Sequence, residues 1–389
     1  MAPSFLQSAA SVSFWPLSSI AALSLAQPEP AAKVPRPSPF ASLSDHLLMQ
    51  LACLPRLLLV SIVYAYYGDW RRYGQTLRAD WVVPIILRDV AICLFVGCVD
   101  SFLLLSPYSP FKARMASRKF NPTYPHLASR NGTSSLLREA FWCCVSACVA
   151  ALLEAGVVHA YATGRFAAVG AAARAAGDAW WADTRTIFFM VTWFYSQNVQ
   201  FYVMHRLLHK WGTTGFPDVG AWLYRNVHAL HHDSKNPTAF SGISMHPVES
   251  ALYFSYALLP CFFGAHFVAF LYIKTNLIAA AMLGHSAFAA PGTGSMPHYL
   301  HHSLVSVNYA ESHVPLDYLF GTWAATEEEA LGVARGVLAP EAAARALRQR
   351  GLEARLAEAL QRVHEDAAAA RKPPTLASSE SAPSPPPPG

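Results

Sequence analysis

The chain alternates long apolar stretches with short polar ones. Four apolar stretches come first, at about residues 47–67, 81–105, 140–161 and 187–204. Each approaches the ~20 residues that an α-helix needs to cross a ~30 Å hydrocarbon core. A longer apolar stretch, about 251–283, follows later and is interrupted by Pro260 and Gly264. The pattern therefore predicts an all-α fold, a multi-pass integral membrane helical bundle.

The first three stretches contain charged residues, which membrane spans rarely carry. These residues are Arg56, Arg88, Asp89, Asp100 and Glu154. Charged side chains near the ends of a span can extend their polar groups to the interface. A tilted or interfacial helix would accommodate them as well. We therefore expect structural or interfacial roles for these charges.

The loop at residues 106–135 indicates how the chain is oriented. It contains no Asp or Glu, and its basic residues are Lys112, Arg114, Arg118, Lys119 and Arg130. The positive-inside rule places such a loop in the cytosol. Two further crossings bring His205 to the same side, so the region after it forms a cytosolic cap. The stretch 251–283 must then cross an even number of times, and we expect no glycan on the sequon at Asn131.

The composition agrees with residence in a membrane. Hydrophobic residues make up 53% of the chain and charged residues 14%, whereas a soluble domain carries about 25% charged residues. The net charge of +5 is modest. The basic residues form no dense patch with interleaved aromatics, so we expect no nucleic-acid partner. The seven cysteines lie in or beside apolar stretches without a Cys-x-x-Cys motif, which is typical of small buried residues.

Histidines are concentrated in one part of the chain, with twelve of the sixteen between His205 and His313. Eight of them form three boxes, His205-Arg-Leu-Leu-His209, His228-Ala-Leu-His231-His232 and His298-Tyr-Leu-His301-His302. On a helix, spacings of three and four residues place side chains on one face. Each box can therefore direct two or three imidazoles toward one point. Eight converging imidazoles are enough to hold two metal ions and too many for one.

The identity of the metal follows less directly from the residues. Neutral imidazole is a suitable ligand for Fe, Zn, Cu and Ni, and Zn has no redox chemistry. A metal site at a lipid–water boundary without an evident nucleophile favours oxidation of a hydrocarbon, which needs a redox metal pair and dioxygen. We therefore expect two iron ions. Second-shell candidates, which would accept a hydrogen bond from the other ring nitrogen of a ligand, are Asp233, Glu249, Glu311 and Asp317.

The ordered boxes resemble those of the fatty acid hydroxylase/sterol desaturase superfamily, whose members are membrane di-iron proteins. Further matching segments are Met245-His246-Pro247-Val248-Glu249, Gly284-His285-Ser286, Asn308-Tyr309 and residues 315–322. Together they cover about residues 180–323, and residues 237–249 resemble the sterol desaturase branch. The chain lacks the fused His-Pro-Gly-Gly cytochrome b5 module of the fungal-type fatty acid 2-hydroxylases. It is also too short for the aldehyde-forming members of wax synthesis with a large C-terminal domain.

The resemblance implies an O2-dependent non-haem di-iron oxidoreductase of the sterol desaturase, C-4 methylsterol oxidase or fatty acid hydroxylase type. Its substrate would be a membrane lipid, a sterol by the branch it resembles, with fatty acid or sphingolipid hydroxylation as the alternative. Electrons would come from NAD(P)H through a reductase and cytochrome b5 in trans, at the endoplasmic reticulum membrane. The eight box histidines correspond to metal ligands and His285 to a further ligand position. His246 corresponds to a ligand or to a second-shell residue.

We expect five segments along the chain. They are a disordered leader (1–45), N-terminal transmembrane helices (46–179), the catalytic domain (180–325), a cytosolic amphipathic helical extension (326–372) and a disordered Pro/Ser tail (373–389). Two other classes of protein remain open, a metal transporter and a metal-binding pseudoenzyme. A transporter would hold its ligands near the midplane of the membrane, whereas these histidines fall at span ends and in the cap. The intact boxes count against a pseudoenzyme.

Overall fold

The computed structural model describes only part of the chain. The described residues are 38, 40–106, 108–110, 119–120, 129–130, 133–166, 180–212, 216–285, 288, 295–326 and 329–333. Among them the regular structure is helical, apart from the short antiparallel pair β1 (Ser129–Arg130) and β2 (Thr133–Ser134) and one isolated bridge. The predicted all-α class is therefore confirmed. Most of the leader, the sequon at Asn131 and nearly all of the C-terminal extension and tail lie outside the described residues, so those expectations stay predictions.

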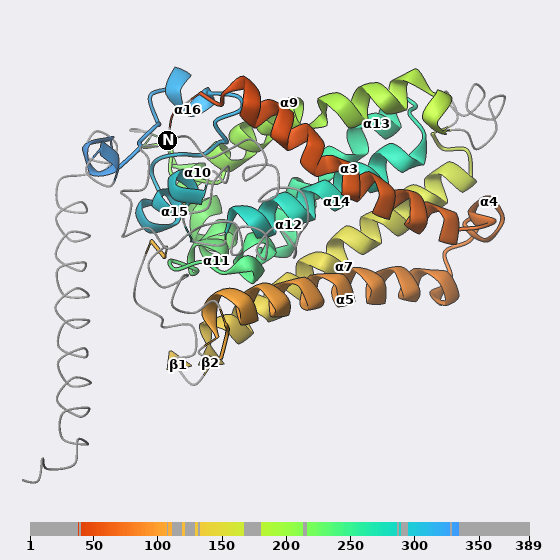
Figure 1. Ribbon diagram of the computed structural model, residues 1–389, viewed down its shortest axis with the longest axis horizontal. Helices are drawn as coiled ribbons and strands as arrows, with labels where there is room; N and C mark the ends of the chain where they lie inside the picture. Colours follow the sequence, from red (N-terminus) through yellow and green to blue (C-terminus); the bar gives the residue numbers. More distant parts are fainter. Residues whose placement is uncertain are drawn as a thin grey trace, which may run out of the picture. The chain divides into compact units, whose positions relative to one another are not determined.

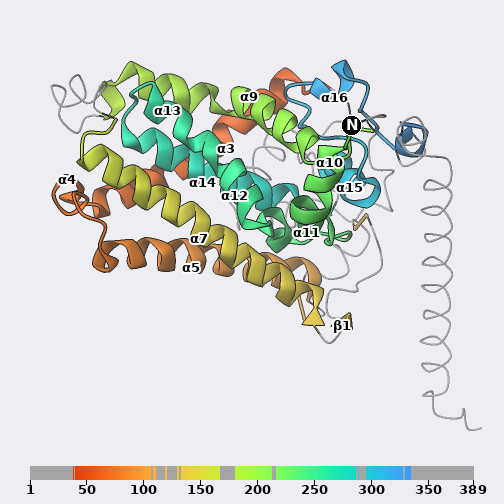
Figure 2. The ribbon, with the colours of Figure 1, turned by 180° about the vertical axis from the view of Figure 1, so that it is seen from behind.

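Three long helices correspond to the first three apolar stretches. They are α3 (Leu43–Tyr66), α5 (Ala79–Leu105) and α7 (Ser135–Ala162), with the short α4 (Trp70–Tyr73) between α3 and α5. Each begins before the apolar stretch that predicted it, because polar residues form its first turn. In α3, Ser42 is the N-cap residue and exchanges hydrogen bonds with Asp45. Helices α5 and α7 lie side by side in both views (Figures 1 and 2).

The fourth apolar stretch forms α9 (Thr184–Leu207), but its role differs from the prediction. Four described helices are long and apolar enough to cross a membrane, namely α3, α5, α7 and α14 (Phe267–Gly284). Helix α9 does not meet that criterion, so the prediction of a span at 187–204 is wrong on this measure. The polar residues responsible include Thr186, Thr192, Ser196, Gln197, Asn198 and Gln200. Because the assignment of the cap to the cytosol counted this crossing, that assignment stays a prediction.

The long stretch 251–283 leaves the histidine-rich end of the bundle and returns to it. The outward segments are α12 (Pro247–Ser255), η5 (Tyr256–Leu258) and α13 (Leu259–Phe262). Gly264 then adopts a positive φ of 75°, which only glycine adopts without strain, and the chain turns into α14. Helix α14 lies in the centre of the bundle, with nearly all of its side chains buried (Figure 1). The predicted break at Pro260 and Gly264 is therefore confirmed, and it brings His285 back beside the first two boxes.

Short elements gather at the end of the long helices where α9 stops (Figure 1). They are α10 (Val219–Leu223), the π-turn η3 (Tyr224–His228), α11 (Ala229–His232), η4 (Ala239–Ile243), α15 (Ser295–Leu304) and α16 (Leu316–Leu319), while η2 (Trp180–Ala182) precedes α9. The segment after α11 is tied to the bundle by buried Glu139 of α7. Its two carboxylate oxygens accept hydrogen bonds from the hydroxyls of Ser234 (2.9 Å) and Thr238 (2.8 Å).

Three of the five charges predicted inside the first spans form, together with Lys274, a buried network that joins three helices. Arg88 of α5 donates to Asp89 (2.7 Å) and to Glu154 of α7 (2.7 Å). Lys274 of α14, which is 3% exposed, contacts the carboxylates of both Asp89 and Glu154, and Tyr67 donates its hydroxyl hydrogen to Glu154. Two cations and two anions therefore balance inside the bundle, and these side chains pair with one another instead of reaching the interface.

Replacing Lys274 with methionine should destabilise the protein strongly. The substitution leaves two buried carboxylates, Asp89 and Glu154, with Arg88 as the one cation of the network, and an uncompensated buried charge costs about 3–5 kcal/mol. We expect a lower Tm for the Lys274→Met variant in detergent, measured by thermal unfolding. The exposed Lys210→Met variant is the matched control and should keep the wild-type Tm. A Lys274→Met variant that unfolds at the wild-type temperature would show that this network does not hold the helices together.

Candidate metal centre

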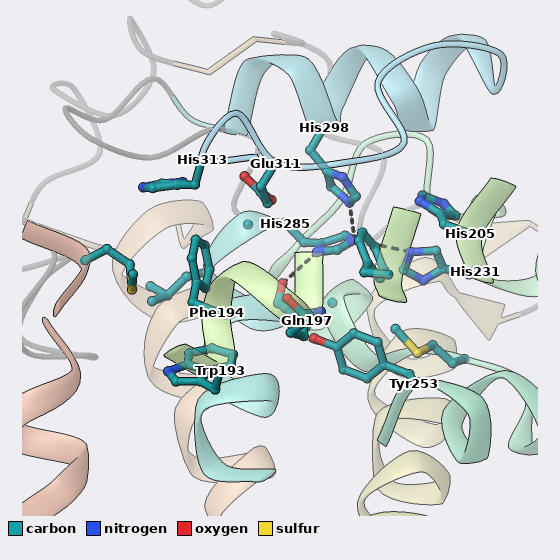
Figure 3. A pocket seen from close by; sticks show the side chains of 18 of the residues that line it. Trp193, Phe194, Gln197, His205, His231, Tyr253, His285, His298, Glu311 and His313 are labelled. Atoms are coloured by element: carbon teal, nitrogen blue, oxygen red, sulfur yellow. Dashed lines mark hydrogen bonds between the residues drawn. The ribbon is translucent and has the colours of Figure 1, made fainter. Parts of the chain in front are cut away.

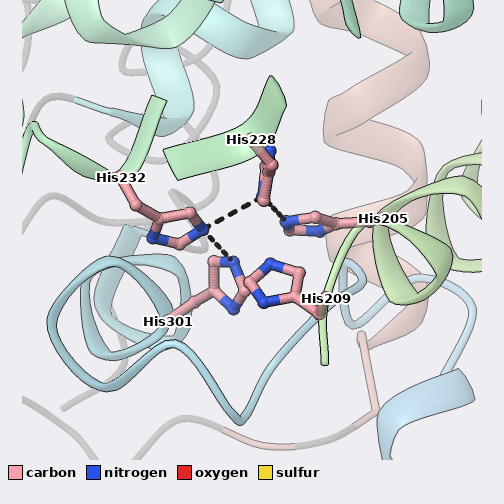
Figure 4. A group of neighbouring side chains, drawn as sticks. All are labelled: His205, His209, His228, His232 and His301. Atoms are coloured by element: carbon pink, nitrogen blue, oxygen red, sulfur yellow. Dashed lines mark hydrogen bonds between the residues drawn. The ribbon is translucent and has the colours of Figure 1, made fainter. Parts of the chain in front are cut away.

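Nine histidines meet at the end of the bundle where α9 stops and α14 returns, and they form two groups. The first histidine group is His205, His209, His228, His232 and His301 (Figure 4). The second histidine group is His231, His285, His298 and His302. In each group, one ring nitrogen per residue lies within 4.8 Å of all the others. The structure thus brings together all eight box histidines and His285; that they bind metal stays a prediction at this point.

The first box enters the site from the C-terminal end of α9. His205 lies in its last turn and His209 directly after its C-cap residue. A separation of four residues keeps both rings on one face, and both belong to the first histidine group. His228 ends the π-turn η3, where the backbone changes its pitch before α11 begins. Such π-turns occur frequently at functional sites.

Neighbouring histidines in the second and third boxes point into different groups. His232 and His301 belong to the first group, whereas His231 and His302 belong to the second. Consecutive residues on a helix are about 100° apart around its axis, given 3.6 residues per turn. Helices α11 and α15 therefore lie between the two groups, and each supplies a ring to both. The His-His pairs in the sequence are what this shared position requires.

The Nδ1 atoms of four of these histidines face hydrogen-bond acceptors on the outside of the site. The acceptors are the carbonyl oxygen of Tyr309 for His205 (2.9 Å), Glu249 Oε1 for His228 (2.7 Å), the carbonyl oxygen of Val307 for His301 (2.6 Å) and the carbonyl oxygen of Ala281 for His285 (2.6 Å). A carbonyl oxygen can only accept, so the Nδ1 atom facing it carries the hydrogen. The Nε2 atom of that ring then presents a lone pair to the interior.

The Nε2 atoms converge at separations that suit a bound metal ion. In the first group they are 3.2 Å apart for His205 and His228, 3.0 Å for His228 and His232, and 3.1 Å for His232 and His301. In the second group they are 2.8 Å apart for His285 and His298 and 3.3 Å for His231 and His285 (Figure 3). Nitrogens bound to one metal at about 2.0–2.1 Å lie about 3 Å from one another. Without a cation the converging lone pairs would repel.

Other ring nitrogens in the site lack a protein partner. Among the described residues, the buried Nε2 of His209 and both ring nitrogens of His302 make no hydrogen bond. A buried polar atom without a partner costs free energy. These orphaned nitrogens, together with the converging lone pairs, show that the residues fit a pair of metal ions. The donor set is all nitrogen, which suits Fe, Cu, Ni or Zn.

Burial keeps the histidines in the form that binds metal. It lowers the pKa of His228 to about 3 and that of His231 to about 4. It also lowers the pKa values of His232, His301 and His302 well below their usual range, and the neighbouring imidazoles lower them further. Neutral imidazole is the metal ligand. At neutral pH the site therefore offers uncharged donors.

Two of the predicted second-shell carboxylates support the site from outside. Glu249 contacts His228 directly, and burial raises its pKa to about 8; a cation nearby would favour the ionised form. Asp317 acts one step further away. Its carboxylate accepts the backbone N–H groups of Tyr309 (2.8 Å) and Ala310 (2.6 Å). It thus fixes the loop whose carbonyl oxygen faces His205.

Two other candidates lie outside both histidine groups. The Asp233 carboxylate is 61% exposed and lies 3.5 Å from Arg138, so its predicted second-shell role is wrong. As the residue directly after the second box it leaves α11 on the outer side. His246 is the N-cap residue of α12 and accepts the backbone N–H of Val248 at 3.2 Å. The structure therefore gives His246 a capping role and brings it into neither histidine group.

An apolar cavity of about 180 Å³ ends against both groups. Its wall includes Met49, Cys53, Trp193, Phe194, Phe201 and Tyr253, and it reaches His205 and His228 of the first group and His231, His285 and His298 of the second. Three aromatic residues of α9, namely Trp193, Phe194 and Phe201, therefore line it. A fourth, Tyr195, does not, because its hydroxyl faces His46 Nδ1 at 3.2 Å. The predicted candidate Glu311 also opens into this cavity (Figure 3).

Sequence reasoning missed the backbone acceptors and two cavity residues, Gln197 and His313. A carbonyl oxygen has no side-chain signature, so Tyr309, Val307 and Ala281 are invisible as acceptors. One signal was available in the Asn308-Tyr309 motif. Asn308 adopts a positive φ of 56° and its side chain bonds to Pro297 and Ala324, which shapes the loop that carries the Tyr309 carbonyl.

Fold and site together define a helical bundle of the multi-pass membrane class, with two groups of buried histidines suited to metal. Residues 189–322 of the chain match the family model described as fatty acid hydroxylase. The predicted resemblance to the fatty acid hydroxylase/sterol desaturase superfamily is therefore confirmed over this part of the chain.

Curated relatives of the same superfamily align with this part of the chain at low identity. Methylsterol monooxygenase 2-2 of Arabidopsis thaliana is 27% identical over 144 residues, which cover 33% of this chain and 50% of the relative. Very-long-chain aldehyde decarbonylase GL1-11 of Oryza sativa subsp. indica is 30% identical over 142 residues, which cover 33% of this chain and 52% of the relative. The chain thus spans about half the length of the curated relatives it matches. No solved structure matches the chain.

The match to an aldehyde decarbonylase bears on one sequence argument. From the sequence, we expect the chain to be too short for the aldehyde-forming members with a large C-terminal domain. In GL1-11 the aligned 142 residues already make up 52% of the protein. The length argument therefore does not exclude relatives of this kind.

Replacing Glu249 with leucine should weaken metal binding. The substitution removes the acceptor for His228 Nδ1, and loss of such a support typically costs about 10–100-fold in metal affinity. We expect purified Glu249→Leu protein to release its metal at correspondingly lower chelator concentrations, measured by elemental analysis after dialysis. The exposed Asp233→Asn variant is the control and should retain metal like the wild type. Equal retention by Glu249→Leu and the wild type would contradict the role of Glu249.

Proposed function

We propose that this protein is a membrane-bound oxidoreductase that uses two iron ions and O2 to hydroxylate or desaturate a lipid, with a sterol as the favoured substrate. The observation that carries this proposal is the apolar cavity whose wall includes histidines of both groups. An apolar cavity with few polar groups is what a lipid chain or ring system requires. The relatives' names, methylsterol monooxygenase and very-long-chain aldehyde decarbonylase, denote enzymes of this chemical range.

Iron held by the two histidine groups would supply the activation of O2 that an unreactive C–H bond needs. The residues of this chain do the rest. The acceptors at the Nδ1 atoms of His205, His228 and His301 hold these rings with their Nε2 lone pairs inward. The apolar wall of α9 and α14 excludes water and holds the lipid against the histidines. Binding and orientation in this cavity would therefore select the carbon that reacts.

The proposal also includes the membrane, the orientation and the electron donor of the enzyme. The basic loop at 106–135 supports a cytosolic catalytic face. The resemblance to the superfamily supports the endoplasmic reticulum membrane and electrons from NAD(P)H through a reductase and cytochrome b5. The position of the histidines at helix ends supports an enzyme over a metal transporter, since a transporter needs ligands near the midplane.

Two other lipid oxidations remain as alternatives within the superfamily. Hydroxylation of a fatty acid or sphingolipid is the first, since residues 189–322 match the fatty acid hydroxylase model. Conversion of a long-chain aldehyde is the second, and the 30% identity to GL1-11 favours it. Lipid profiling distinguishes all three by product.

Removing one histidine from either group should abolish lipid oxidation. The protein and its variants are expressed in yeast strains that each lack one sterol or sphingolipid oxidase, and the lipid product is measured by mass spectrometry of total lipids. We expect His301→Ala and His302→Ala to reduce the product to the level of the strain without the protein. Iron content should fall from about two ions per chain, the stoichiometry of a two-metal site. His159→Ala is the control, because His159 lies outside both histidine groups, where it bonds to the carbonyl oxygen of Gly74. Normal lipid oxidation and iron content in both alanine variants would refute the proposal.

A further inference from the structure

The cavity beside the histidines is mostly apolar, but several polar side chains outside the histidine groups open into it. Three of them are Arg56 on α3, Gln197 on α9 and Glu311 on the loop before α16. The guanidinium of Arg56 already donates to the side-chain oxygen of Asn276 at 2.9 Å. Among the residues that the structure describes, no hydrogen bond or ion pair involves the side chain of Glu311 or Gln197. Glu311 and Gln197 thus face the cavity with unused hydrogen-bonding capacity, as does His313, whose two ring nitrogens make no hydrogen bond among the described residues.

Of these groups, the carboxyl group of Glu311 has the greatest need of a hydrogen-bond partner. This group lies between His313 and His298 and points into the cavity (Figure 3). Burial, and to a smaller extent the nearby Asp317, raises its pKa to about 7. A carboxyl group in such a place costs free energy until a donor reaches it. No protein group donates a hydrogen bond to the Glu311 carboxyl group among the described residues, and because this group lines the cavity, a molecule bound there can supply the donor.

We propose that Glu311 accepts a hydrogen bond from a hydroxyl group of the lipid in this cavity, with Gln197 as a second polar contact. The protein would then select lipids that carry a free hydroxyl close to the carbon presented to the histidines. This inference takes the lipid substrate from the proposed function and adds a requirement on its chemistry. Binding of the lipid does not depend on whether oxidation follows.

The position of Glu311 gives the hydroxyl a directing role. Glu311 and His298 of the second histidine group line the same cavity. A hydroxyl held at Glu311 therefore keeps the neighbouring carbons beside the histidines and leaves the remaining apolar body against the aromatic wall. A lipid without a hydroxyl would leave the carboxyl group desolvated and unpaired, which disfavours its binding.

An anionic lipid is the competing occupant. Its carboxylate would pair with the cation of Arg56 and meet an unfavourable neighbour in Glu311 when that group is ionised. Since Arg56 is already bonded to Asn276, while Glu311 has no such partner among the described residues, the observations favour a hydroxyl donor. The two occupants respond in opposite directions to removal of the Glu311 charge.

The test measures equilibrium binding to purified full-length protein in detergent. The probes are cholesterol and its 3-methyl ether, a long-chain fatty alcohol and its methyl ether, and oleate. We expect at least one free alcohol to bind about tenfold more tightly than its ether, the effect of one hydrogen bond to a charged or buried carboxyl group. Glu311→Leu should remove this preference, and Glu311→Gln should retain part of it through its amide oxygen.

Controls separate the inference from folding and from catalysis. Each variant is checked for wild-type Tm and wild-type iron content, so a misfolded protein is recognised. Met49→Leu, which changes an apolar residue of the same cavity, should affect alcohol and ether alike. The sterol and fatty-alcohol pairs show which of the two lipid skeletons the cavity takes.

Three results would overturn the inference. They are equal binding of alcohol and ether by the wild type, an alcohol preference that persists in Glu311→Leu, and tighter binding of oleate than of either alcohol. A protein that binds alcohols through Glu311 but oxidises no lipid would refute the proposed function and leave the inference standing. A protein that oxidises lipids without this preference would do the reverse.

Discussion

The constraint on which this structure depends is the convergence of nine imidazoles, eight of them buried, on two points at one end of the bundle. Such an arrangement is unfavourable by itself, because converging lone pairs repel and buried ring nitrogens without partners cost free energy. Acceptors behind His205, His228, His285 and His301 hold the rings in this tautomer. Cap and bundle therefore store an unfavourable arrangement that a cation relieves, which is the physical basis for assigning a metal centre here.

The arrangement of the helices in the bundle brings the histidines together. Helix α9 ends at the site, and the segment from α12 to α14 leaves it and returns, so His285 joins residues far away in sequence. The buried ion pairs among α5, α7 and α14 join these helices away from the cap. Placing these charges in the apolar interior costs desolvation free energy. Their pairing also fixes how the three helices are aligned with one another. Precision at the histidines thus depends on contacts inside the apolar part of the molecule.

Much of this arrangement was predictable from the sequence, and the rest was not for physical reasons. Helical spacing and apolar length predict the class, the three long N-terminal helices and the convergence of the boxes, because they are local properties. The partition of His231 and His232 between two groups depends on how α11 sits between neighbours, which is a tertiary property. Asp233 follows the second box directly and was misjudged, because proximity in sequence says little about the direction of a side chain.

The position of α11 and α15 between the two histidine groups has a consequence for how metal is acquired. Each helix supplies rings to both groups, so an ion bound in one group would order a wall of the other. The entropic cost of ordering that wall would then be incurred by the first ion only. If both groups bind metal, their occupancy would be coupled, and by thermodynamic reciprocity each ion would raise the affinity for the other to the same extent. Chains would accordingly partition between empty and doubly loaded forms, with few in between.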